Sequence, residues 1–178
     1  IGMQPWMNLG YGNKIYIPEC NHPFGTGWSP LGTDRARKGW CHFVDALARH
    51  YKGRITHFEI WNEPDGAEYY WKPVAKQDPV GVVELTKLTV PVIRHHIQDA
   101  VIIGGVIAEP IRHFNFIEDL LKNGIADVLD RFSVHFYTDT PEVVDGLFYS
   151  SLSCALDRAK PGLKIWQGES GAQSMPHG

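Results

Sequence analysis

The 178-residue sequence has little of what defines several large classes of protein. It holds only three cysteines, Cys20, Cys41 and Cys154, and this odd number at wide spacing predicts no disulfide framework. No apolar run reaches about 18 residues, so we expect no membrane as a partner. No basic cluster occurs and the formal net charge is −3, which argues against nucleic acid as a partner.

The chain also lacks an obvious targeting segment. It begins at Ile1 without the charged and apolar regions of a signal peptide. An absent initiator Met is equally consistent with missing upstream sequence, so localisation is left open, as is the oligomeric state. What the chain does have is a hydrophobic content of 43%, enough for one sizeable core.

Strand and helix signals alternate along the sequence. Strands are expected within 1–9, 54–62, 101–106, 131–137 and 163–169. Helices are expected after an N-cap at Thr33 up to Gly53, after Asp78-Pro79 up to Ile97, over 113–123, and after Thr140-Pro141 up to Ala159. Such alternation predicts a parallel sheet built from βα units, forming one domain or part of one.

Two of these strands alternate apolar and polar residues. Phe58 precedes Glu59 in the second strand, and Phe132 precedes Ser133 and His135 in the fourth. Because an open sheet covered on both faces is apolar on both, the polar positions favour a barrel interior that opens into a site. We therefore expect an α/β fold, a (β/α)8 TIM-type barrel that is incomplete here, with about five βα units. Glu59 would then lie buried in mid-strand and must be paired or protonated.

Two glutamates stand at the carboxyl ends of predicted strands. Glu63 follows the second strand and Glu169 ends the last. In a barrel such ends face one another across the mouth. Paired carboxylates are what sugar hydrolysis needs, since one protonates the leaving oxygen and the other attacks the anomeric carbon or activates water. Each glutamate taken alone is also explained as an ordinary loop carboxylate.

A resemblance rests on the run WNEP at 61–64 and the run ESG at 169–171. Together they resemble the retaining glycoside hydrolases of clan A, which share a (β/α)8 barrel. In that clan the Asn-Glu pair ends the fourth strand and the second glutamate ends the seventh. Segments 4–13, 103–108 and 133–137 resemble, in order, the end of the third strand, the fifth and the sixth. The pattern is most similar to the β-xylosidase, endoglucanase and β-galactosidase-type families, among which the sequence does not choose.

The resemblance implies a role for each matching residue. Glu63 would be the general acid/base and Glu169 the nucleophile of a retaining mechanism that cleaves β-glycosidic bonds. Asn62 would bond the sugar 2-hydroxyl, and Tyr137 would orient Glu169. His135 lies on the same strand face as Tyr137, although a core histidine explains it equally well. The implied partner is an oligosaccharide or β-glycoside, and no metal or other cofactor is implied.

Two tryptophans are candidates for stacking on the apolar face of a sugar ring. Trp71 follows Glu63 in the loop 68–73, and Trp6 lies near the start of the chain. Each is explained as well by packing over the core. Asp65, next to Gly66, is interpreted as a turn residue rather than a catalyst.

The length of the chain qualifies this interpretation. A full barrel takes roughly 250 residues, so by the resemblance the first two strands and the eighth are absent. The arginine that the clan usually has on the second strand and the tryptophan that it has on the eighth would be absent as well. We therefore expect residues 1–178 to form a single partial barrel, the catalytic domain or part of it, whose activity in isolation is open.

Two other functions are alternatives to glycoside hydrolysis. A non-catalytic carbohydrate-binding barrel remnant would keep an aromatic mouth but would not need both glutamates. A metal hydrolase would use Cys20, His22, Cys41 and His42, but their spacing matches no recognised ligand pattern, and the apolar face of a helix explains Cys41.

Overall fold

The structure, a computed structural model, describes residues 2–21, 27–73, 76–138 and 148–171. Its strands form one five-stranded sheet in the order β1-β2-β3-β4-β5, and every neighbouring pair is parallel. The strands are β1 (Trp6–Leu9), β2 (His57–Ile60), β3 (Val101–Ile107), β4 (Arg131–Tyr137) and β5 (Lys164–Gly171). Each strand thus lies beside the next one in sequence, which confirms the prediction of a parallel sheet of βα units.

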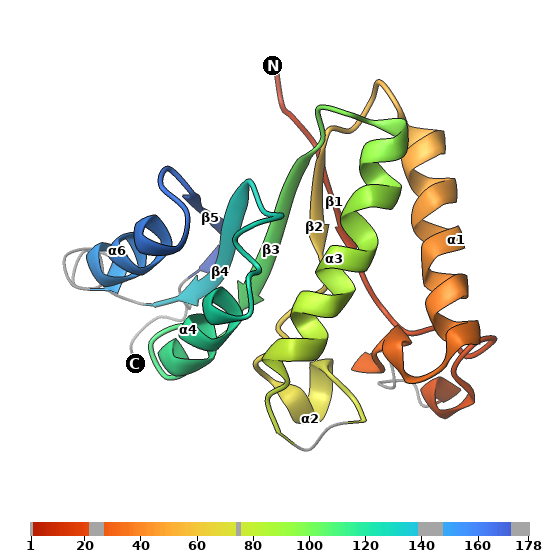
Figure 1. Cartoon of the computed structure of the whole chain (residues 1–178), viewed down its shortest axis with the longest axis horizontal. Coiled ribbons are helices and arrows are strands. Elements are labelled where there is room, and N and C mark those ends of the chain that lie inside the picture. The colour runs from red at the N-terminus through yellow and green to blue at the C-terminus, as the bar shows by residue number, and fades with distance from the viewer. Residues whose placement is uncertain (1, 22–26, 74–75, 139–147, 172–178) are drawn as a thin grey trace, which may run out of the picture.

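Helices connect the strands. They are α1 (Asp34–Tyr51), the short α2 (Ala67–Tyr70), α3 (Pro79–His96), α4 (Phe114–Lys122) and α6 (Ser150–Ala159), with 3-10 turns at Pro18–Asn21 and Pro30–Gly32. Helices α1, α3, α4 and α6 follow one another along the sheet, and each packs against the next (Figure 1). The helix expected from residue 140 is described only from Ser150; its first part lies outside the described residues. No helix in the described part of the chain is long and apolar enough to cross a bilayer.

Local chemistry sets where the two longest helices begin. Thr33 Oγ1 accepts a hydrogen bond from Ala36 N at 3.1 Å and caps α1. Asp78 Oδ1 accepts one from Gly81 N at 2.9 Å and caps α3, whose first residue is Pro79. A side-chain oxygen here satisfies an amide that has no partner within the helix. Both caps agree with the sequence prediction.

The sheet curls rather than lying flat. In a flat sheet strands two positions apart are separated by about 10 Å, and strands four apart by about 19 Å. Yet the Ser133 hydroxyl on β4 bonds Glu59 on β2 at 2.6 Å. The rings of Trp6 on β1 and Trp166 on β5 are 6.1 Å apart, centroid to centroid. The side chains of one face therefore converge, as they do inside a barrel, and the prediction of an incomplete (β/α) barrel is confirmed.

The other face of the sheet carries the apolar core. Phe58, Ile102, Phe132 and Val134 have no exposed surface and belong to one cluster with buried residues of α1 and α3. Burying each such side chain contributes roughly 1.5–3 kcal/mol. The alternation seen in the sequence therefore separates an apolar layer under the helices from a polar interior.

Candidate active site

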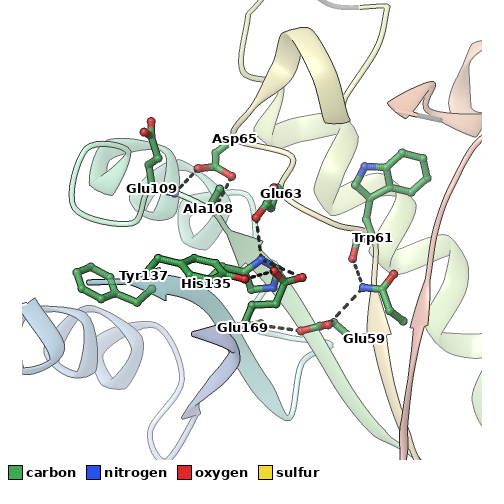
Figure 2. A network of polar contacts seen from close by, with 12 residues as sticks. Glu59, Trp61, Glu63, Asp65, Ala108, Glu109, His135, Tyr137 and Glu169 are labelled. Atoms are coloured by element: carbon green, nitrogen blue, oxygen red, sulfur yellow. Dashed lines mark hydrogen bonds and ion pairs between the residues drawn. The ribbon is translucent and has the colours of Figure 1, made fainter. Parts of the chain in front are cut away.

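Glu59 lies in mid-strand in this interior, with 3% of its surface exposed. Its Oε1 accepts a hydrogen bond from Ser133 Oγ at 2.6 Å, and its Oε2 accepts from Trp6 Nε1 and Asn8 Nδ2 at 3.3 Å each. An unpaired charge at such a position costs several kcal/mol, so these donors compensate its burial. Of the two alternatives expected for a buried Glu59, pairing and protonation, the structure shows hydrogen-bond partners on both oxygens (Figure 2).

Gly168 lets β5 approach this polar interior. A Cβ atom at that position would lie 2.7 Å from Ser133 Oγ, 2.8 Å from Glu59 Oε1 and 3.0 Å from His135 Nε2. Real Cβ atoms do not come so close to heavy atoms, so any side chain would displace the network. The glycine next to Glu169 is therefore a packing requirement of the site.

Glu63 follows β2 in a loop held from both sides. Trp61 is 1% exposed, its ring packs edge-on to Trp71 at 5.3 Å, and its carbonyl accepts from Asn8 Nδ2 at 2.8 Å. Trp61 and Glu63 have φ values of 69° and 47°, a conformation that L-residues seldom adopt. Gly66 N closes the turn by donating to Glu63 O at 3.0 Å. The Glu63 side chain is 15% exposed and points toward His135 (Figure 2).

Glu169 stands on β5 in a more open environment. Its side chain is 46% exposed, and its Oε2 accepts a hydrogen bond of 2.8 Å from the Tyr137 hydroxyl. The hydrogen bond to Glu169, then burial and the charges of Glu169 and Glu63, raise the pKa of Tyr137. The phenol therefore keeps its proton and stays a donor. The contact between Tyr137 and Glu169 expected from the resemblance is present.

His135 connects the two glutamates. It is fully buried, and its Nδ1 lies 2.9 Å from Glu63 Oε1 and 3.7 Å from Glu169 Oε1. Burial by itself lowers the pKa of the imidazole, but the hydrogen bond to Glu63 and the charges of Glu169, Glu63 and Glu59 outweigh burial. The pKa of His135 is therefore raised, and the charged form is favoured between the carboxylates. His135 is thus not an isolated core residue.

Asn62 and two tyrosines complete the surroundings of the carboxylates. Asn62 is partly buried, and its side chain is near enough to the Tyr11 phenol that this contact by itself lowers the pKa of that group. Burial first, and then the charges of Tyr70, Glu63 and Glu169, raise the pKa of Tyr11. Burial and the same two glutamates raise the pKa of Tyr70. Both phenols therefore lie within electrostatic reach of the catalytic candidates.

Sequence reasoning missed these two tyrosines. Tyr11 comes two residues after Leu9, the last residue of β1, so the rule that loops after barrel strands build the site would have found it. Tyr70 precedes Trp71 in the same aromatic run, and the larger indole ring is the more obvious stacking candidate from sequence. Nothing in the spacing of that run tells which ring faces the site.

Trp71 does not have the exposed ring that sugar stacking requires. It is 1% exposed, its Nε1 donates to Asp78 Oδ2 at 3.1 Å, and its ring meets Trp61. This packing favours the core alternative for Trp71 over sugar stacking. Tertiary packing uses this ring to join the Glu63 loop to the start of α3.

Trp6 is 45% exposed but lies at the opposite end of the strands. It begins β1 and is in register with His57, the first residue of β2, whereas Glu63 follows the last residue of β2. Its Nε1 donates a hydrogen bond to Glu59 Oε2, and its ring packs against Trp166. This placement argues against a stacking role beside Glu63 and Glu169.

Asp65 is more than a turn residue. Its side chain has no exposed surface, and it accepts hydrogen bonds from Ala108 N at 2.9 Å, Glu109 N at 3.0 Å and His113 Nδ1 at 2.8 Å. It therefore joins the loop after β2 to the loop after β3 (Figure 2). The sequence contains no local signal for a partner more than 40 residues away.

The cysteines do not gather into a metal site in the described part of the chain. Burial raises the thiol pKa of Cys20 and of Cys41, which disfavours the thiolate that binds metals. His22, the neighbour of Cys20 in that hypothesis, lies outside the described residues. The described group with metal-ligand proximity is instead Glu63, His135 and Glu169, whose ligand atoms lie within 4.8 Å of one another.

No family model and no curated protein matches this chain. Solved structures do match. A GH39 β-xylosidase from Caulobacter crescentus superimposes on 99% of the chain with a TM-score of 0.75 and 20% identity. The chain covers 39% of that protein. A GH39 enzyme from Xanthomonas axonopodis pv. citri matches 95% of the chain, and 37% of its own length, with a TM-score of 0.72 and 18% identity.

This chain has the fold of a partial (β/α)8 barrel. The resemblance to clan A glycoside hydrolases is thereby confirmed at the level of the fold. A shorter solved structure, a curdlan-specific exo-β-1,3-glucanase of family GH128 from Blastomyces gilchristii, matches 94% of the chain and 76% of its own length. Its TM-score is 0.55 and its identity 18%. The chain spans about two fifths of the GH39 structures, so the activity of the whole protein is a proposal.

Proposed function

We propose that residues 1–178 carry the catalytic centre of a retaining glycoside hydrolase that cleaves β-glycosidic bonds. The observation that carries the proposal is the approach of the glutamates: an oxygen of Glu63 and one of Glu169 lie within 4.8 Å of each other, and both are near His135 Nδ1. Carboxyl groups of retaining enzymes are about 5–5.5 Å apart, and those of inverting enzymes about 6.5–9.5 Å. The short separation supports attack by a carboxylate rather than by water. The glycosidases that share the fold support a carbohydrate substrate.

The first step of the proposed reaction forms a glycosyl-enzyme. A Glu169 oxygen attacks the anomeric carbon, the bond from that carbon to the glycosidic oxygen breaks, and the leaving oxygen takes the proton of Glu63. Because Glu169 is more exposed than Glu63, a sugar is able to approach it. In the second step Glu63 removes a proton from water, the water oxygen bonds to the anomeric carbon, and Glu169 leaves. Two inversions give net retention.

The surrounding residues have defined tasks in this proposal. Tyr137 donates to Glu169 and so holds one oxygen in place while the other is free to attack. Asn62 is the candidate donor to the sugar 2-hydroxyl, a bond that strengthens in the transition state. His135 Nδ1, 2.9 Å from Glu63 Oε1, donates a hydrogen bond to the Glu63 carboxylate after Glu63 has lost its proton.

Azide rescue tests the role of each glutamate. Glu169→Ala cannot form the glycosyl-enzyme, so it is expected to be inactive, and added azide should attack from the vacated face to give an inverted glycosyl azide. Glu63→Ala retains the nucleophile, so a substrate with a good leaving group should glycosylate Glu169 and then stall. Azide should release that intermediate with retained configuration. Proton NMR of the first-formed products distinguishes the two cases.

Two outcomes would contradict the proposal. An inverted sugar from the unmodified protein, or exchanged azide stereochemistry between the variants, would reject the assigned roles. Saturable binding of a β-glycoside by the unmodified protein, with no turnover even of an activated aryl glycoside, would favour the alternative of a non-catalytic carbohydrate-binding barrel remnant.

A further inference from the structure

Asp65 is a buried carboxylate that no step of the proposed reaction uses. Both of its oxygens are occupied, by two consecutive backbone amides and by His113 Nδ1, all within 3.0 Å. A carboxylate that accepts several short hydrogen bonds is held in one position. It therefore provides a fixed point on the loop that follows β2.

That fixed point is two residues from Glu63, in the same turn. Gly66 N donates to Glu63 O at 3.0 Å, and Gln77 Nε2 donates to the Asp65 carbonyl at 3.3 Å. Glu63 has a φ of 47°, a conformation that L-residues seldom adopt and that persists only where its surroundings enforce it. The anchoring of Asp65 is one such constraint on the Glu63 backbone.

The segment whose amides bond Asp65 follows a bulge at the end of β3. Within β3, Gly105 and Val106 have φ values of 89° and 55°, and the register with β4 shifts between Gly105 and Ile107. A bulge of this kind redirects the end of a strand. The two amides that bond Asp65 belong to Ala108 and Glu109, immediately after the bulge.

We propose that Asp65, together with His113, is a positioning residue for Glu63. It fastens the Glu63 turn to the end of β3, the strand between β2 and β4, and so holds the Glu63 carboxyl against His135 Nδ1 (Figure 2). The consequence for proton transfer rests on the function proposed above, whereas the consequence for the position of Glu63 does not.

Two variants of graded severity test the proposal. Asp65→Asn replaces one acceptor oxygen by an amide that cannot accept, and His113→Gln disturbs one of the three hydrogen bonds and leaves the backbone pair intact. Asp130→Asn is the matched control. Asp130 Oδ2 also accepts from a backbone amide, Ile102 N at 2.8 Å, but near the other end of β3.

The first readout is the ¹⁵N NMR signal of His135 Nδ1, assigned by its loss in His135→Gln. It is expected to change in Asp65→Asn, to change less in His113→Gln, and to match the unmodified protein in Asp130→Asn. An unchanged signal in a folded Asp65→Asn or His113→Gln protein would overturn the proposal, as would an equal change in Asp130→Asn.

The second readout compares β-glycosides with poor and good leaving groups. Loss of a positioned acid matters only where the leaving oxygen needs a proton, and general acid catalysis contributes about 100–10,000-fold. Partial misplacement in Asp65→Asn should therefore lower kcat roughly 10–100-fold for an alkyl glycoside, and less than about 3-fold for a 2,4-dinitrophenyl glycoside. Equal losses on both would reject positioning. If the unmodified protein hydrolyses neither substrate, the proposed function fails, while the His135 signal still decides the role of Asp65.

Discussion

The strand that precedes Glu63, β2, and the strand that contains Glu169, β5, differ in how deeply they are buried. Every residue of β2 except the first is buried, and the loop behind it is packed with the rings of Trp61 and Trp71. No residue of β5 is fully buried, and Glu169 depends on a hydrogen bond from an exposed tyrosine. The difference matches the proposed tasks. A proton donor works in a fixed, enclosed place, whereas a nucleophile must be reached by the substrate.

The comparison also separates stability from activity. Changes on the β2 side should unfold the chain, because core packing and the position of Glu63 depend on the same rings. Changes on the β5 side should affect turnover and leave the fold intact, except where β5 touches the polar interior at Gly168. Four substitutions test this contrast.

Trp61→Ala should have the largest effect. Its ring is 1% exposed and contacts the rings of Tyr11, Trp40 and Trp71, so truncation should lower the free energy of unfolding by roughly 3–5 kcal/mol. Denaturant titration measures the loss. Tyr69→Ala, at a residue 70% exposed, is the control and should change stability by less than about 0.5 kcal/mol. Similar losses in the two variants would mean that the aromatic cluster does not support the Glu63 loop.

Tyr137→Phe comes next. It removes the hydroxyl that orients Glu169, so turnover should fall about 10–1,000-fold, equivalent to about 1.4–4 kcal/mol of barrier. The unfolding midpoint should barely move, since Tyr137 is 61% exposed. Steady-state kinetics and a thermal melt of the same sample measure both effects. If Tyr137→Phe turned over substrate as fast as the unmodified protein, the hydrogen bond from Tyr137 would not be needed to orient Glu169.

Gly168→Ala should be costly despite the exposure of β5. The added methyl would press on Ser133 Oγ and Glu59 Oε1 at less than 3.0 Å, so we expect a loss of about 1–3 kcal/mol in unfolding free energy. Gly32→Ala is the control, because a Cβ there meets nothing within 4 Å. Equal stability of the two variants would show that β5 moves freely over the interior.

His135→Gln should have the smallest effect on the fold at neutral pH and a distinct effect on its pH dependence. The folded-state pKa of His135 is raised above its unfolded value of about 6.5, so its contribution to stability is fully present below about pH 6.5. It is lost as the pH rises through the folded-state pKa. Unfolding free energies from about pH 5 to about pH 9 should therefore decline less in the variant. A steeper decline would reverse the inferred charge of His135.

Much of the architecture followed from the sequence because its signals are local. The caps at Thr33 and Asp78 act within one helical turn, and the alternation of Phe132, Ser133 and Val134 reports the two faces of one strand. The need for Glu59 to be paired or protonated also followed from elementary electrostatics, since an unpaired buried charge is costly. The identity of that partner did not follow, because Ser133 lies 74 positions away.

Some features of the candidate site could also be predicted from local sequence signals, and others could not. The WNEP run and the glutamate that ends the last predicted strand identified Glu63 and Glu169 as candidates, since residues at the ends of parallel strands share one edge of the sheet. The direction in which each aromatic ring points was not available from the sequence. Trp71 is in the core and Tyr11 is beside Asn62, although both follow strand ends.

The sequence by itself therefore determined the order of strands and helices and the polar interior, and it identified the two glutamates as candidates. Only the tertiary structure decided that Trp71 is buried, that Trp6 lies at the far end of β1, and that Asp65 joins two loops. The physical reason is the separation in sequence between the residues that interact. Caps, turns and strand alternation depend on neighbours a few residues away, whereas burial of a loop ring or carboxylate depends on which distant segments the curled sheet brings beside it.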